Sequence, residues 1–245
     1  MFLSNCFNQK TLREIMQVAL LMPNIKYYIG NLTQTVITVA ETAAVKLMPK
    51  EEEDRDTLAA WLNNQINNAR YQLKKTITTS LSKDSGMQNI ADLAAHLFSK
   101  RKYFSPTLSV YFRIALIRAE IQKNHHVDHF WSKVDDELQK MHEGGPEALV
   151  ADLETCYEED VDAFGDPSKS KCTPSTEMVG EKKPAWYRAL HANVAKIQRV
   201  KLRTAPGKRK REEDDEADDS DKEPEDSEPP ADEEEDDSGP PENVD

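Results

Sequence analysis

The chain has 245 residues, 31% of them charged, and a formal net charge of −13. It contains only 8 glycines and no apolar run near the ~18 residues of a membrane span, which argues against glycine loops that cradle phosphates and against membrane-spanning helices. Hydrophobic residues make up 38% of the chain and are almost absent from its acidic C-terminal end, so the remainder can form one ordinary globular core.

Charge divides the chain into three parts. Residues 1–166 hold 18 Lys/Arg and 23 Asp/Glu, whereas residues 167–211 hold 13 Lys/Arg and only two acidic residues. Residues 212–245 hold 20 acidic residues and a single lysine, Lys222. This partition predicts a folded domain, then a basic segment, then an acidic tail.

Helical periodicity dominates the first part of the chain. The helix that starts at Ser105-Pro106 is apolar nearly all round, which places it at the centre of a bundle. Trp131 shares an apolar stripe with Val134 and Leu138, so it is predicted to be buried. Apolar residues at three- and four-residue steps predict helices over 11–22, 51–81, 90–98, 105–121, 128–141 and 149–164.

The segment 25–48 is ambiguous. It is rich in Thr, Val and Ile around Val36, Ile37 and Val39. β-Branched residues lower helix propensity and favour strands, so both a helix and a partial strand stay open here.

These patterns predict an all-α fold: a bundle of six to seven helices, a basic linker and helix, and a disordered acidic C-terminal tail. The linker is recognised by its mixture of Gly, Pro, Ser, Thr and Lys. The expected boundaries are a helical domain at 1–166, the linker at 167–183, a basic amphipathic helix at 184–203, a basic import-type segment at 204–211 and the tail at 212–245.

The sharpest functional motif is the basic run Lys208, Arg209, Lys210 and Arg211. It follows Pro206-Gly207, which keeps the backbone out of a helix, and four adjacent cations on an extended chain are what a nuclear import receptor binds. The run therefore predicts a nuclear localisation. A second basic cluster lies just upstream and consists of Lys196, Arg199, Lys201 and Arg203.

The acidic tail is too polar to form a core and is predicted to stay disordered. It suits binding of basic nuclear proteins such as histones, masking of the chain's own basic segment, or simple solubility. Ser220, followed by Asp221 and Glu223, offers a phosphorylation site to an acid-directed kinase.

The helix at 184–200 has an apolar stripe and several basic residues, and three interpretations compete. It docks on the bundle as a last helix, binds a groove of a partner protein, or lays its basic side on nucleic acid. Lys100-Arg101-Lys102-Tyr103 forms a further short basic spot.

The sequence offers no catalytic, cofactor-binding or metal-binding residue. His125, His126 and His129 cluster, but surface histidines in a loop explain them better than a metal site. Cys156 sits among acidic residues, which disfavour its thiolate. The carboxylates at 135–137 and 158–160 are expected on solvated helix faces.

Three sparse cysteines suit a reducing compartment, and no secretory signal opens the chain. We therefore expect a non-enzymatic nuclear protein with a helical protein-interaction domain and an acidic regulatory tail, associated with chromatin or transcription and not with a membrane. The alternative is a sequence-tolerant nucleic-acid-binding protein that uses helix 184–200 and the basic run at 208–211, masked by the acidic tail.

Overall fold

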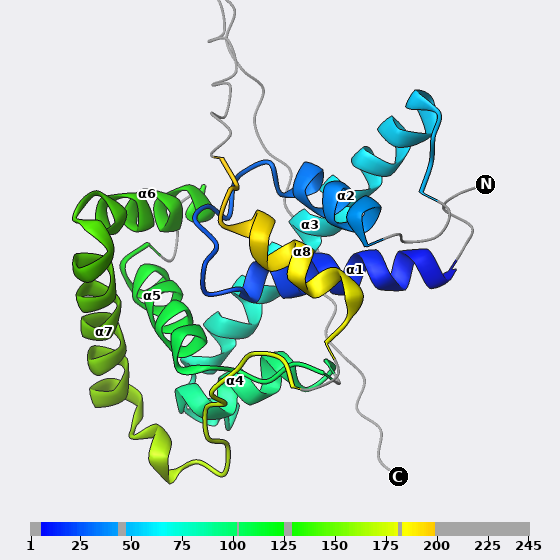
Figure 1. Ribbon diagram of the computed structural model, residues 1–245. Coiled ribbons are helices and arrows are strands. Elements are labelled where there is room, and N and C mark those ends of the chain that lie inside the picture. Colours follow the sequence, from blue (N-terminus) through cyan, green and yellow to red (C-terminus); the bar gives the residue numbers. More distant parts are fainter. Residues whose placement is uncertain (1–5, 44–47, 102, 125–128, 181–182, 199–245) are drawn as a thin grey trace, which may run out of the picture. The chain divides into compact units, whose positions relative to one another are not determined.

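The computed structural model describes residues 6–43, 48–101, 103–124, 129–180 and 183–198 (Figure 1). All of them belong to one compact unit, Met1–Leu202. Their regular secondary structure is helical, with isolated β-bridges and no strands among the described residues, which confirms the all-α class. The helices are α1 (Cys6–Leu21), α2 (Leu32–Thr42), α3 (Glu52–Ser80), α4 (Ile90–Phe98), α5 (Leu108–Asn124), α6 (Phe130–Glu143), α7 (Gly145–Phe164) and α8 (Ala185–Val194).

The ambiguous segment 25–48 forms the helix α2, preceded by an irregular stretch. Val36, Ile37 and Val39 of this helix are buried, and α2 packs against α8 and α3. Burial of these β-branched side chains against two other helices outweighs their weak preference for strands.

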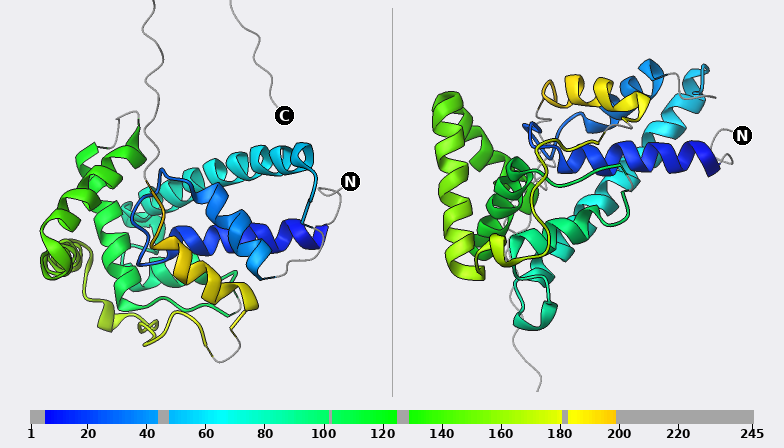
Figure 2. Two further views of the ribbon diagram at one scale, coloured as in Figure 1. Left: turned by 45° about the horizontal axis from the view of Figure 1, so that its top comes forward. Right: turned by 60° about the horizontal axis from the view of Figure 1, so that its bottom comes forward.

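Helix α5 is the central element, as its apolar residues predict. Ten of its 17 residues are buried, and α5 contacts α3, α4, α6 and α7. Figures 1 and 2 show α7 running beside α5, with α6 near one end of both. The helix starts at Leu108, two residues after the predicted Ser105-Pro106 start, because the backbone of those two residues bonds to another segment.

Helix α3 has 29 residues and is the longest of the described helices. It contacts α1 and α2 as well as α5. Its first half contacts α2, where Thr33 hydrogen-bonds Asn63, and its last residue, Ser80, contacts Arg118 of α5. Leu58, Leu62, Ile66, Leu73 and Ile77 form its buried stripe. The opposite side of α3 is therefore left to solvent.

The segment 167–183, predicted as a linker, is packed in its described part, 167–180 and 183. Met178 and Val179 are buried in the core. The Ser105 amide donates to the Met178 carbonyl at 2.9 Å, and the Ser175 amide donates to the Pro106 carbonyl at 2.8 Å. Glycine, proline and serine mark an irregular backbone here, and two apolar residues are enough to fix that backbone on the helices.

Helix α8 docks on the bundle, which was the first of the three interpretations. Trp186, Leu190 and Val194 are buried, and α8 packs against α2 and α1. The rings of Trp186 and Phe104 stack with centroids 5.6 Å apart. Its apolar stripe is consequently not available to a partner protein.

Gly30 allows the residues after α8 to lie close to the loop before α2. A Cβ added at Gly30 would lie 2.5 Å from Cγ2 of Ile197 and 2.7 Å from the carbonyl oxygen of Gln198.

We expect Gly30→Ala to lower the free energy of unfolding in urea by about 1–3 kcal/mol, as overpacked sites do. Gly180→Ala is the control, because no atom lies within 4 Å of a Cβ added there. Equal stability of the two variants would contradict this packing.

Candidate functional site

Most residues of the predicted import and regulatory motifs lie outside the described part of the chain. Lys196 is described; it follows α8 and is exposed. On α8 itself, Arg188 and His191 are exposed. The predicted residues outside the described part are Arg199, Lys201, Arg203, Lys208, Arg209, Lys210, Arg211 and Ser220.

The histidine cluster is described only at His129, which is exposed and has a left-handed backbone (φ 65°) just before α6. Residues 125–128 lie outside the described part. Within the residues that the structure describes, no group of three metal-ligating side chains comes together.

The thiol of Cys156 is half-buried on α7. Burial raises its pKa, Lys123 opposes the rise, and acidic neighbours led by Glu159 add to it. The thiolate is thus disfavoured as predicted, although burial, rather than the acidic surroundings, is the main cause.

Two of the carboxylates expected on solvated faces are in fact buried: Asp135 of α6 and Asp160 of α7. Each is paired with hydrogen-bond donors that come from distant parts of the sequence. A helical pattern cannot show such a donor, so both residues were assigned to the wrong face.

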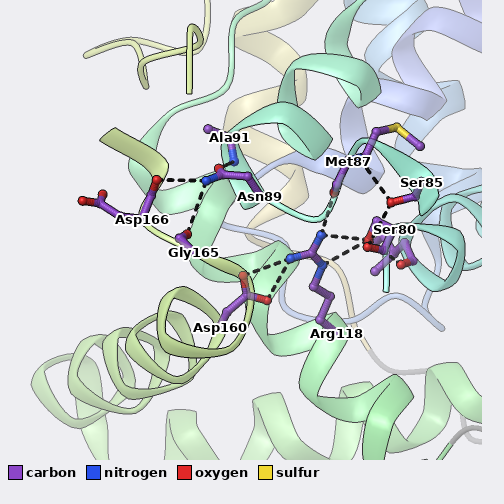
Figure 3. A network of polar contacts seen from close by, with 10 residues as sticks. Ser80, Ser85, Met87, Asn89, Ala91, Arg118, Asp160, Gly165 and Asp166 are labelled. Atoms are coloured by element: carbon purple, nitrogen blue, oxygen red, sulfur yellow. Dashed lines mark hydrogen bonds and ion pairs between the residues drawn. The ribbon is translucent and has the colours of Figure 1, made fainter. Parts of the chain in front are cut away.

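Asp160 belongs to a buried polar network that joins four elements (Figure 3). Arg118 of α5, fully buried, donates from Nη1 to both carboxylate oxygens of Asp160 at 3.0 and 3.2 Å. Its Nε and Nη2 donate to Oγ of Ser80 at the end of α3, and Nη2 also donates to the Met87 carbonyl. Asn89, which caps α4, donates to the Gly165 carbonyl beyond α7.

This network ties α3, α4, α5 and α7 together. Each nitrogen of the Arg118 guanidinium has an acceptor, and the ring of Phe164 lies 4.8 Å from its Cζ. Burial raises the pKa of Asp160, and the adjacent Arg118 charge opposes that rise. A buried ion pair in which every guanidinium nitrogen is bonded holds helices in register rather than moving protons.

Asp135 fixes the loop before α2. Its two carboxylate oxygens accept the backbone N–H groups of Tyr28 at 2.6 Å and Ile29 at 2.7 Å. Tyr28 is itself buried, and its ring lies 4.8 Å from the ring of Trp131. Trp131 packs against the core but is only half-buried, so its predicted burial is confirmed in part: the loop at Tyr28 lies against the indole, and part of the ring stays at the surface.

Beyond its acidic first turns, the exposed side of α3 carries no negative charge. From Thr57 to Ser80 the helix has Arg70, Lys74 and Lys75 but no Asp or Glu. Its solvent ridge is formed by Asn64, Asn67, Asn68, Tyr71, Gln72, Lys75 and Thr79, all exposed. We call this ridge and the two recesses beside it the α3 face.

The first recess lies between α1, α3 and α4 and has a volume of about 370 Å³. Arg13, Lys100 and Arg101 line it together with the amides of Gln65, Asn68 and Gln72. The Arg101 side chain lies over the ring of Phe98. This recess therefore includes part of the basic spot at 100–103.

The second recess lies on the other side of α3, against the start of α6, and has a volume of about 390 Å³. It is lined by Ile29, Asn67, Arg70, Tyr71, Lys74, His129, Phe130 and Trp131. No carboxylate of the described residues lines either recess. In both, the arginine, Arg101 or Arg70, is half-buried, and its buried Nε–H finds no acceptor among the described residues.

The α3 face went unrecognised in the sequence because it is not a run of basic residues. Its signal is the stretch Asn63–Lys75, in which six amide side chains and three cations occur without an acidic residue. Only the helical geometry shows that Tyr71 and the amides share the exposed ridge, with a recess on either side.

No helix in the described part of the chain is both long and apolar enough to cross a membrane. Comparison of the chain with protein-family models, with curated proteins and with solved structures finds no match.

Proposed function

We propose that this chain is a non-enzymatic nuclear protein whose helical domain binds nucleic acid with little dependence on sequence, within chromatin- or transcription-associated complexes. The composition left a protein partner and a nucleic acid as alternatives. The α3 face favours the second. In this proposal the face takes the place of helix 184–200, whose apolar stripe is buried.

The observation that carries this proposal is the chemistry of the α3 face. Lysine, arginine, amide and tyrosine side chains are the groups that proteins use to contact phosphate and sugar. Two recesses with cations lie at the same level of α3, one on each side of the exposed ridge. A helix with its side chains is about 10–12 Å wide, so a polyanion that crosses α3 can reach both recesses.

Binding of the full chain to oligonucleotides at 50 and 200 mM salt tests this proposal. If the face neutralises about four phosphates, affinity should fall roughly 50- to 150-fold over that range. Deletion of 212–245 should tighten binding at low salt, because the tethered tail competes for the same cations, and the gain should shrink as salt rises. A chain that binds no oligonucleotide at 50 mM salt, with or without the tail, would refute the proposal.

Nuclear localisation is proposed on the basic run alone. Replacement of Lys208, Arg209, Lys210 and Arg211 by alanine removes the charges that an import receptor would bind, so a fluorescent fusion should spread into the cytoplasm. A second variant that also replaces Lys196, Arg199, Lys201 and Arg203 tests whether the upstream cluster suffices. Full nuclear retention of that variant would contradict the assignment.

A protein partner of opposite charge is the second candidate, and helix α7 favours it. Residues 143–166 contain nine acidic residues and no Lys or Arg, and Glu154, Glu158, Glu159 and Asp162 are exposed. Such a face suits a basic nuclear protein such as a histone. Salt-sensitive binding of histones by the chain without its tail would support this candidate, because the tail would then not be needed.

A further inference from the structure

We infer that the recess between α3 and α6 binds single-stranded nucleic acid, with a base stacked on Tyr71 and Trp131 and a phosphate held by Lys74 and Arg70. The inference rests on the proposed function and names its ligand class and site. It is carried by four features of the second recess: its rings, its cations, its rigidity and its size.

The rings of the recess are placed at the surface. Tyr71 is 61% exposed although it is a large aromatic residue, and Trp131 beside it is half-buried. Both line the same recess. An aromatic ring offers a stacking surface to any base, which gives affinity without sequence preference.

The cations of the recess lie next to these rings. Nζ of Lys74 is 4.3 Å from the centroid of the Phe130 ring, and Nη1 of Arg70 donates to the Asn67 amide oxygen at 3.1 Å. Burial lowers the pKa of Arg70 to about 10, and the Asp135 carboxylate opposes this shift, so Arg70 is still a cation at pH 7. The Asp135 carboxylate in turn accepts hydrogen bonds from the backbone N–H groups of Tyr28 and Ile29.

The recess is formed before any ligand arrives. Asp135 holds the loop at Tyr28, Arg70 donates from Nη2 to the Tyr28 carbonyl, and Trp131 is packed between Tyr28 and Phe130. Few side chains or loops would have to become ordered when a ligand binds, so little binding free energy is lost to ordering. A volume of about 390 Å³ is within the range of small-ligand sites and suits one nucleotide.

Other ligands fit these features less well. An aromatic recess can bind methylated lysine, but here Lys74 already covers the Phe130 ring and the described lining is positive, which repels a cation. A duplex keeps its base faces stacked on one another and cannot offer one to Tyr71. An acidic peptide would pair with the cations but would leave the exposed ring unused. Single-stranded nucleic acid can contact both the cations, through its phosphates, and the exposed ring, through a base.

Anisotropy titration of the full chain with a labelled 12-nucleotide oligothymidine, and with a duplex of equal length, tests the inference. Tyr71→Ala should weaken single-strand binding about 5- to 150-fold, the effect of losing one stacked base. Binding of the duplex should change little.

Tyr71→Phe keeps the ring and should restore most of the affinity for the single strand. The ring is exposed, so thermal unfolding of Tyr71→Ala should match that of the wild type. Val150→Ala, which truncates an exposed apolar residue of α7 outside both recesses, is the control.

The phosphate contact has its own readout. Lys74→Gln should make the slope of log affinity against log salt shallower by about 0.7, the value for one phosphate of a single strand. Lys140→Gln, which removes an exposed lysine of α6, should leave the slope unchanged.

The outcomes separate the inference from the proposed function. Salt-dependent binding that is indifferent to Tyr71→Ala, or that prefers the duplex, overturns the inference and leaves the proposed function in place. Absence of binding to both oligonucleotides overturns both. Competition by polyglutamate as effective as that by unlabelled oligothymidine shows an acidic-protein site and overturns the inference.

Discussion

Replacement of Arg118 by methionine should lower the free energy of unfolding by about 3–5 kcal/mol, a large part of the stability of a single domain. The substitution leaves Asp160 as a buried carboxylate without its cation, and it leaves Ser80 Oγ and the Met87 carbonyl without this donor. Urea unfolding followed by tryptophan fluorescence measures the change.

The double variant Arg118→Met, Asp160→Leu is the control for this prediction. Removing both charges avoids the uncompensated carboxylate, so the double variant should recover most of the lost stability and lie within about 1–2 kcal/mol of the wild type. Asp162→Asn, an exposed position two residues further on, should change stability by less than about 0.5 kcal/mol. Additive losses in the double variant would show that the pair does not act as one unit.

Asp135→Ala should cost about 2–4 kcal/mol, because the Tyr28 and Ile29 N–H groups both lose their acceptor. The loop that these groups anchor also carries the Tyr28 carbonyl that binds Arg70. We therefore expect Asp135→Ala to weaken binding of oligothymidine as well as stability.

Asp135→Asn should have a smaller effect on stability, since its amide oxygen can still accept one of the two N–H groups. Asp152→Asn, exposed on α7, is the matched control and should leave both stability and binding unchanged. Wild-type stability of Asp135→Ala would contradict the role of this carboxylate in fixing the loop.

The apolar pattern predicted much of the fold because helix burial is periodic. Helix α5 was expected at the centre from its nearly continuous apolar residues, and it is the most buried helix. The first helix was expected from residue 11, whereas α1 already includes Cys6. Patterns locate a helix more reliably than they locate its ends.

The pattern failed where a single polar residue has a distant partner. Asp135 and Asp160 follow the charge pattern of solvated faces, yet the Tyr28 amide and the Arg118 guanidinium make their burial favourable. The same holds for the segment at 167–183, where Met178 and Val179 are enough to pack a stretch with the composition of a linker.

The candidate site was least accessible to sequence reasoning. The basic run at 208–211 stands out in the sequence and stays a prediction, because it lies outside the described residues. The α3 face combines residues of α1, α3, α4 and α6, which are separated by more than 100 positions in the chain and meet only in the fold. Its one local signal, an amide-rich stretch without acidic residues, is also typical of an ordinary solvated helix.

Ultraviolet crosslinking of the full chain to oligothymidine, with mass-spectrometric identification of the crosslinked peptides, tests the central claim most directly. The α3 face predicts crosslinks at Tyr71 and Trp131, where bases would lie against the rings. These crosslinks should disappear when the salt concentration is raised from 50 to about 500 mM, because salt screens the phosphate contacts. Crosslinks confined to residues 184–211, with none on α3 or at the start of α6, would contradict the claim and assign nucleic-acid binding to the basic segment instead.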